Sequence, residues 1–295
     1  LYSSLELVLC DVDESLCLDP ISLKKIITKD TLAVIFVGLG GNTNHLENIN
    51  KICKGNKTSI ILDAAHMAGS KIRTNAYPHL GSFADFICYS FQAVKNLGIA
   101  DSGMLCTNED KYLDEISKYR WMGINKTTYQ RTQSKDDKCY KWEYEIDRLG
   151  YKYNGNALIA SCCLAMMPYL EKSNIYRRSL RQRYIKGLKS VPEITFISHL
   201  NEKVTSSHLA QILLKDGTSS NERNIIISKL NENKIYPGVH YRALSQFKYY
   251  KPFAKYVGKS ENISNRLISL PCHLEIELED IDIIVSSLIK VVKQV

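Results

Sequence analysis

The stretch SIILDAAH, residues 59–66, decides the fold, because an apolar run ends there in an acid followed by small residues. Similar apolar runs occur at 33–37, 85–89 and 103–106, and we expect each of them to form a strand. Continuous apolar runs are typical of strands that are buried on both faces of a sheet. An acid at the carboxyl end of a parallel strand faces the ligand crevice of an α/β sheet, which makes Asp63 a candidate site residue.

Helical patterns separate these runs. Residues 20–27 are expected to form a short helix, with Asp19 as its N-cap and proline at its first position. We also expect helices over 44–53 and 109–120. Strands that alternate with helices predict an α/β fold, with a mostly parallel sheet covered by helices on both faces.

The pattern changes in the second half of the chain. The polar and aromatic stretch 125–145 has no clear period and is expected to be a long loop. A helical pattern over 155–189 is expected to be interrupted or bent at Pro168. Beyond it we expect short strands at 195–197, 209–214 and 239–241. We expect helices at 221–233 and 280–293. The sequence therefore predicts a large domain over 1–172, and a long helix with a small α+β domain over 173–295.

Composition excludes several classes of protein. Of the 295 residues, 44% are hydrophobic and 24% are charged, which excludes a disordered chain, a collagen-like repeat and a disulfide miniprotein. No apolar run approaches the roughly 20 residues that span a bilayer, so we expect no integral membrane protein. The net charge of +8 suits an anionic small molecule as well as RNA. The basic run at 177–183 is typical of a solvated helix face, although it would also help to attract a diphosphate.

The cysteines indicate a reducing compartment. There are nine of them, and no pair has C-x-x-C spacing. Cys10, Cys53, Cys88 and Cys106 lie in or beside apolar runs, where a free thiol packs as a small hydrophobe. We therefore expect reduced thiols in a cytoplasmic protein, and no zinc or other metal site.

Two residues directly after predicted strands are candidates for chemistry. The first is Asp63, for which the ordinary alternative is a helix N-cap. The second is Lys95, the only charged residue within 87–100. Apolar surroundings lower the pKa of a lysine and free its amine as a nucleophile, although a lone lysine is ordinarily a snorkelling surface residue. A third candidate is the segment 150–156, because the N–H groups at a helix start bind anions such as phosphate.

Asp63, Ser90 and Lys95 together meet the needs of pyridoxal 5'-phosphate (PLP). A PLP enzyme requires a lysine that forms a Schiff base with the cofactor. It requires a carboxylate that keeps the pyridine nitrogen protonated, and donors such as hydroxyl groups for the phosphate. The ends of neighbouring strands would supply all three groups.

Short motifs run in a fixed order through the whole chain. They lie at 10–13 with 19–20, 63–66, 90–97, 150–154, 239–241 and 270–271. Through these motifs the chain resembles the DegT/StrS family of PLP-dependent nucleotide-sugar aminotransferases. The resemblance implies the type I transferase fold, with a large PLP-binding domain and a small C-terminal domain.

The resemblance also implies roles in cofactor binding. Lys95 would be the catalytic lysine, bound to PLP as a Schiff base, and Asp63 would pair with the pyridine nitrogen. His66 would lie beside the cofactor ring near its phenolic oxygen. Ser90 would bind the cofactor phosphate.

Further residues are implied at a subunit interface and at the substrate. Asn154 would reach the phosphate of the cofactor in the partner subunit, so the family's active sites are shared across a homodimer. His240 and Tyr241 match a motif that lies near the sugar. The implied reaction transfers an amino group from glutamate to a keto-deoxy-sugar nucleotide, in amino-sugar and cell-surface glycan biosynthesis. The Lys95 amine would act as the general base that moves a proton from the Cα atom of the donor.

The chain departs from the family pattern in two places. Residues 101–103 read Asp-Ser-Gly where the family usually has Glu-Gly-Gly. The family also has a segment ahead of the position of Leu1, which supplies a phosphate cup and an aromatic residue that stacks on the ring. Nothing in this sequence matches that segment, so we expect that an N-terminal piece is missing from it.

Three other functions are weighed against the aminotransferase. A non-catalytic relative, or an inactive fragment, would act as a structural or regulatory partner. Sugar dehydratases of the family carry a histidine in place of Lys95, which this chain retains. A nucleic-acid-binding module fits the charge but has no recognition motif here.

Overall fold

The computed structural model describes residues 2–74, 79–127, 129–130 and 142–295. The loop predicted at 125–145 lies partly outside these residues, as does Cys139. The other cysteines are free thiols, as predicted, but Cys88 is exposed, so the prediction that it packs as a core hydrophobe is wrong. No helix in the described ranges is long and apolar enough to cross a membrane.

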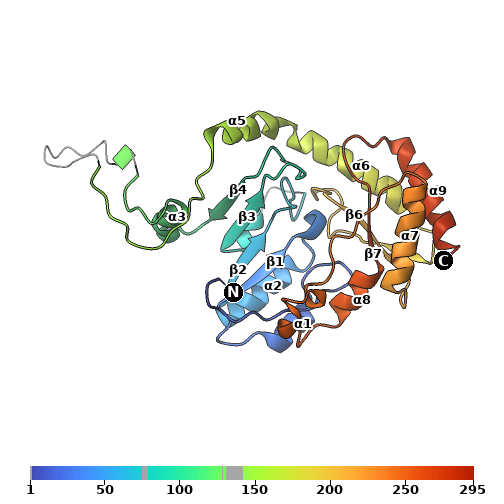
Figure 1. The fold of residues 1–295 in the computed structure, drawn as a ribbon, viewed down its shortest axis with the longest axis horizontal. Coiled ribbons are helices and arrows are strands. Elements are labelled where there is room, and N and C mark those ends of the chain that lie inside the picture. The colour runs from blue at the N-terminus through green and yellow to red at the C-terminus, as the bar shows by residue number, and fades with distance from the viewer. Residues whose placement is uncertain (1, 75–78, 128, 131–141) are drawn as a thin grey trace.

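The first half of the described chain contains a mixed sheet (Figure 1). Its strands, in spatial order, are β1 (Ala33–Val37), β2 (Ser59–Asp63), β3 (Phe86–Ser90) and β4 (Gly103–Thr107). The first three are parallel, and β4 runs antiparallel to β3. The prediction of a mostly parallel sheet is confirmed, and the carboxyl ends of β2 and β3 lie side by side.

Helices α1 (Pro20–Ile26) and α2 (Leu46–Asn56) cover one face of this sheet. Asp19 caps α1 as predicted, because its side chain accepts a hydrogen bond from the N–H group of Ile21. Alternate side chains of β1 and β2 are buried in the core with these helices. The side chain of Ile35 points the other way and is 60% exposed. The prediction of a strand that is buried on both faces is therefore wrong for β1, of which only one face is packed in the described residues.

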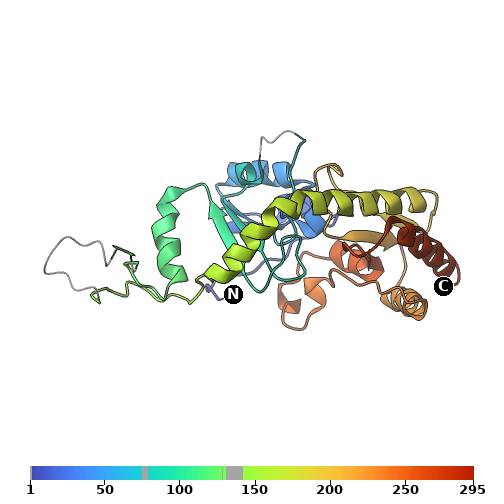
Figure 2. The ribbon, with the colours of Figure 1, turned by 90° about the horizontal axis from the view of Figure 1, so that it is seen from above.

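Helices within the described residues connect the first sheet to the second half of the chain. Helix α3 (Leu113–Arg120) follows a 3-10 turn and accounts for the helix predicted at 109–120. Helix α5 (Ala157–Met166) is separated from α6 (Leu170–Leu188) by a 3-10 turn that contains Pro168. The predicted interruption is therefore confirmed. Figure 2 shows α5 and α6 following one another along the length of the molecule.

A smaller antiparallel sheet occupies the second half of the described chain. Its strands are β5 (Ile194–Phe196), β6 (Ala210–Leu214) and β7 (Leu267–Leu270), in that order. Its helices are α7 (Ser220–Glu232), α8 (Lys259–Arg266) and α9 (Leu278–Val292). The core between them includes Leu180 and Tyr184 of α6. The domain boundary proposed at 172/173 falls in the first turn of α6, whose later turns pack on this sheet.

Most elements predicted for this half are present. The strands near 195–197 and 209–214 and the helices near 221–233 and 280–293 are confirmed. The strand predicted at 239–241 is wrong, because only Gly238 forms a bridge there, to Ser269 of β7. Strand β7 and helix α8 were missed.

Two of the four arginines in the basic run on α6 are buried, so the predicted solvated face is wrong for them. Arg181 is fully buried and Arg177 is 8% exposed. Both guanidinium groups donate to backbone carbonyl oxygens, Arg177 to that of Cys272. These buried arginines are therefore structural, and they do not form a surface that attracts a diphosphate.

Replacing Arg181 with alanine is expected to lower the free energy of unfolding by about 3–5 kcal/mol. Its guanidinium donates to the carbonyl oxygens of Leu209 at 2.7 Å and Ile197 at 3.0 Å, and pairs with the carboxylate of Glu202 at 2.7 Å. The substitution leaves two carbonyl groups without their donor and removes the cation beside a partly buried carboxylate, which then keeps the hydrogen bond from the N–H group of His199 at 2.7 Å. Urea denaturation followed by circular dichroism measures the change.

Arg183→Ala is the matched control on the same helix. Arg183 forms an ion pair with Asp282, and both side chains are exposed. Because exposed ion pairs contribute little to stability, we expect a far smaller change than for Arg181. Equal losses in the two variants would contradict a structural role for the buried arginine.

Candidate active site

A turn holds the carboxylate of Asp63 at the carboxyl end of β2. Asp63 lies between Val37 of β1 and Cys88 of β3 in the sheet register. Its Oδ1 atom accepts a hydrogen bond of 3.0 Å from the N–H group of Ala65. The N–H group of Ala64 donates to the carbonyl oxygen of Cys88 at 2.9 Å. Because this turn follows the strand and no helix begins here, the alternative that Asp63 is a helix N-cap is wrong.

A second turn brings Lys95 to the same end of the sheet. The hydroxyl oxygen of Ser90, the last residue of β3, accepts from the N–H group of Gln92 at 3.3 Å. The N–H group of Lys95 donates to the carbonyl oxygen of Gln92 at 2.8 Å. Burial lowers the pKa of the Lys95 amine, and the charge of Asp63 opposes this by raising it. Lys95 is half-buried and electrostatically coupled to Asp63, which a snorkelling surface lysine would not be.

His66 is held as a neutral imidazole. Its Nδ1 atom accepts a hydrogen bond of 3.3 Å from the N–H group of Gly40, so the proton of the neutral ring is on Nε2. Burial, together with the smaller effects of the charges of Lys95 and His240, lowers the pKa of His66 to about 3. The Ser206 hydroxyl donates to the carbonyl oxygen of His66 at 2.6 Å. The ring is thereby fixed beside the Lys95 amine without carrying a charge of its own.

His240 and Tyr241 reach this place from the second half of the chain. The ring of Tyr241 lies 6.3 Å from that of His66, centroid to centroid, with 27° between the two planes. Gln211 of β6 donates from Nε2 to the carbonyl oxygen of His240 at 2.6 Å. Burial lowers the pKa of His240, and the charge of Lys95 adds to this effect. The structure therefore brings together six of the predicted residues: Asp63, His66, Ser90, Lys95, His240 and Tyr241.

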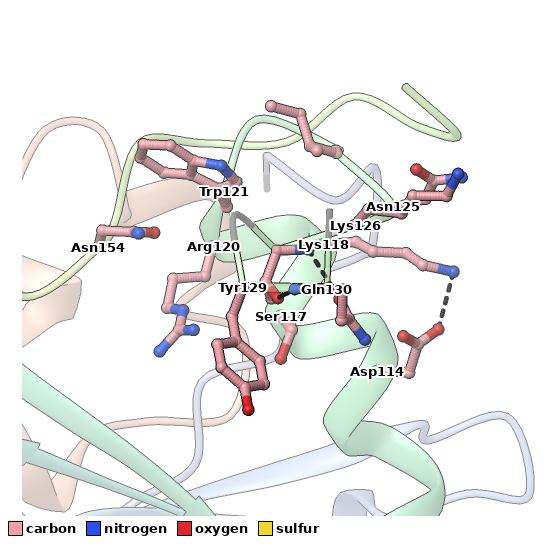
Figure 3. A pocket seen from close by; sticks show the side chains of 12 residues that line it. Asp114, Ser117, Lys118, Arg120, Trp121, Asn125, Lys126, Tyr129, Gln130 and Asn154 are labelled. Carbon is pink, nitrogen blue, oxygen red and sulfur yellow. Dashed lines mark hydrogen bonds and ion pairs between the residues drawn. The ribbon is translucent and has the colours of Figure 1, made fainter. Parts of the chain in front are cut away.

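Asn154 lies apart from these residues. It lines a pocket of about 490 Å³ beside α3, and Figure 3 shows it near Trp121 and Arg120. The N–H group of the neighbouring Tyr153 donates to the carbonyl oxygen of Arg120 at 2.9 Å, which fixes this segment to the end of α3. Within one chain, Asn154 does not join the cluster around Lys95.

Sequence reasoning missed three polar residues beside the cluster: Asn96, Asn174 and His208. The ring of His208 lies 4.3 Å from that of His66, at an angle of 37°. Burial lowers the pKa of His208 to about 2, with neighbouring positive charges as smaller causes. Asn96 bonds to residues that lie 78 and 112 positions away in the chain, and no local pattern marks such contacts.

The donor set suits an aromatic cofactor with a basic ring nitrogen and an aldehyde. Asp63 offers a carboxylate for a protonated ring nitrogen, and Lys95 offers an amine with a lowered pKa for the aldehyde. The Nδ1 atom of His240 is buried and has no hydrogen-bond partner in the structure, so one polar atom of this cluster is available to a ligand. Within the described ranges, no group of three or more His, Cys, Asp or Glu residues is placed to hold a metal ion.

Known proteins resemble this chain over most of its length. It is 25% identical over 278 residues to UDP-4-amino-4,6-dideoxy-N-acetyl-beta-L-altrosamine transaminase of Helicobacter pylori, a match that covers 92% of this chain and 69% of that protein. It is 26% identical over 292 residues to the spore coat polysaccharide biosynthesis protein SpsC of Bacillus subtilis, covering 97% of this chain and 73% of that one.

A solved structure shares the fold. The protein Spr1654 of Streptococcus pneumoniae, assigned as a sugar aminotransferase, matches in its PMP form with a TM-score of 0.85 and 25% identity. The match covers 97% of this chain and 76% of that protein, which also matches in its PLP form. The predicted type I fold is thus confirmed. The model of the DegT/DnrJ/EryC1/StrS aminotransferase family matches residues 1–289, and the chain belongs to this family.

Proposed function

We propose that this protein is a PLP-dependent aminotransferase that transfers an amino group from glutamate to a keto-deoxy-sugar nucleotide. The observation that carries the proposal is the half-buried Lys95 amine coupled to the Asp63 carboxylate, at the carboxyl ends of β2 and β3. This pair supplies a nucleophilic amine and a fixed negative charge at one place.

Four residues would hold the cofactor. When bound, PLP supplies an aldehyde for an amine and a protonated ring that withdraws electrons. The Asp63 carboxylate would accept a hydrogen bond from the ring nitrogen and keep it protonated. The neutral His66 ring would lie beside the cofactor near its phenolic oxygen, and the Ser90 hydroxyl would donate to the phosphate. Lys95 would provide the amine.

The Lys95 amine would also move the proton. A general base works best when its pKa is near the operating pH, and burial shifts that of Lys95 downward in this direction. Its Nζ atom would take the proton from the Cα atom of the bound donor. Asp63 would stabilise the positive charge on the ring nitrogen meanwhile.

The names of the relatives support a sugar-nucleotide acceptor. One is named as a transaminase of a UDP-linked amino sugar, and the other as a protein of polysaccharide biosynthesis. We therefore assign this chain to amino-sugar synthesis for cell-surface glycans. His240 and Tyr241 would contact the sugar, since both lie beside His66 and carry polar groups.

Asn154 would act in the active site of a partner subunit. In its own chain it lines a pocket beside α3, on the segment that leads into α5. A homodimer of twofold symmetry would bring this segment to the second subunit. Its side-chain amide would then donate to the cofactor phosphate there.

Reduction with borohydride after incubation with PLP is expected to fix the cofactor to the peptide that carries Lys95. Peptide mass mapping identifies the modified lysine. Lys95→Arg should lose this label, because its guanidinium is not a comparable nucleophile. Label scattered over surface lysines, or no label, would favour the alternative of a non-catalytic relative.

Acylation of Lys95 in the cofactor-free protein is expected to have a lower pH midpoint than acylation of the exposed Lys24. Burial lowers the pKa of Lys95, so its free amine appears at lower pH. Asp63→Asn should lower the midpoint further, because the carboxylate raises this pKa and its removal leaves burial unopposed. Trace labelling followed by mass spectrometry measures the midpoints of Lys95 and Lys24 in the same sample, for the wild type and then for the variant. An unchanged or higher midpoint in the variant would contradict the coupling.

Mixing the Lys95→Ala and Asn154→Ala proteins is expected to restore activity that neither has alone. A hybrid dimer contains one site with both native residues, so statistical mixing should give roughly a quarter of the wild-type signal. Single-turnover release of 2-oxoglutarate from glutamate measures it. No recovery in a mixture shown to exchange subunits would count against shared sites.

A further inference from the structure

The side-chain amide of Asn96, the residue after Lys95, is hydrogen-bonded to two distant parts of the chain. Its Nδ2 atom donates to Oδ1 of Asn174 on α6 at 2.6 Å and to the carbonyl oxygen of Ser206 at 2.7 Å. Its Oδ1 atom accepts from Nδ1 of His208 at 2.6 Å. Both N–H groups of the amide and one of the two lone pairs on its oxygen therefore take part in hydrogen bonds.

Backbone carbonyl groups determine which way these amides face. The carbonyl of Ser206 can only accept, so the atom of Asn96 that faces it must be the nitrogen. The Nδ2 atom of Asn174 donates to the carbonyl oxygen of Ala68 at 3.0 Å, which leaves its Oδ1 atom to accept from Asn96. The remaining Oδ1 atom of Asn96 therefore needs a donor, and Nδ1 of His208 must carry a proton.

Burial makes these bonds hard to replace. Asn174 and Ser206 are both 0% exposed, so water does not reach these two partners of Asn96. A buried polar group that loses its partner retains the full cost of its desolvation. The segment that ends at His208 also holds His66, through the hydroxyl of Ser206 and the contact between the two rings.

We propose that Asn96 and His208 are positioning residues for Lys95 and His66. Asn96 ties the turn that carries the Lys95 amine to α6 and to the segment ahead of β6. The same amide holds His208 as the Nδ1–H tautomer, and its uncharged ring packs against the ring of His66.

This assignment gives the two neighbouring imidazoles opposite tautomers. His66 accepts at Nδ1 from the N–H group of Gly40 and carries its proton on Nε2. His208 donates at Nδ1 and has its free lone pair on Nε2. Neither ring carries a charge, so neither repels a protonated Lys95. The inference rests on the proposed function of Lys95, but the tautomers and the bonds of Asn96 do not require a bound cofactor.

Nitrogen-15 NMR of the histidine side chains tests the tautomers directly in the cofactor-free protein. The His208 signals, assigned by their loss in His208→Gln, are expected to show a protonated Nδ1 and an unprotonated Nε2 at neutral pH. The His66 signals should show the reverse. A protonated Nε2 on His208 of the wild-type protein would overturn the proposal.

Asn96→Ala tests the positioning of Lys95. The looser turn should expose the amine to water, so the pH midpoint of Lys95 acylation is expected to move upward, towards that of Lys24. The matched control is Asn42→Ala. Asn42 is 1% exposed and its amide also bridges distant segments, from Ser15 to Leu200, but it does not adjoin Lys95.

The control variant should leave the Lys95 midpoint and the His208 tautomer unchanged, even where it lowers thermal stability. An unchanged midpoint and tautomer in folded Asn96→Ala would overturn the proposal. Borohydride labelling in the wild type is a separate measurement. Its failure would remove the proposed function of Lys95, whereas the acylation and NMR results would still test the role of Asn96.

Discussion

The amine of Lys95 is subject to two opposing influences, and the rest of the site depends on their balance. Burial favours the neutral amine, and the carboxylate of Asp63 favours the charged one. The balance requires both groups at one end of the first sheet, which the parallel pairing of β2 and β3 provides. It also requires that the nearby rings carry no charge. Burial meets this requirement by lowering the pKa values of His66, His208 and His240.

The second sheet takes part in this arrangement. Gln211 of β6 holds the backbone of His240, and the hydroxyl of Ser206, just ahead of β6, holds the backbone of His66. Asn96 connects the Lys95 turn to the same segment. The residues proposed for the chemistry therefore lie at strand ends of the first sheet, and their geometry depends on the packing of the second sheet against them.

Local patterns predicted most of the strands, the break at Pro168 and the two candidates Asp63 and Lys95. Each of these follows from residues that are neighbours in the sequence. The errors arose where burial depends on distant parts of the chain. Arg181 reads as a surface residue because charged side chains are rarely fully buried, yet carbonyl groups and Glu202 satisfy it. The sequence predicts a strand at 239–241, but the carbonyl oxygen of His240 accepts a hydrogen bond from the side chain of Gln211 and not from a neighbouring strand.

The residues proposed to carry the chemistry and those proposed to position them differ in how far the sequence reveals them. Asp63 and Lys95 each lie at a recognisable strand end, so their types and places indicate their chemistry without a structure. Asn96 and His208 are common polar residues whose partners lie far away in the chain. A relative could therefore keep both strand-end motifs and lose the amide next to its lysine. Such a protein would still have the groups of an aminotransferase, but its amine would be held by fewer bonds, so the motif alone does not specify the geometry on which the amine depends.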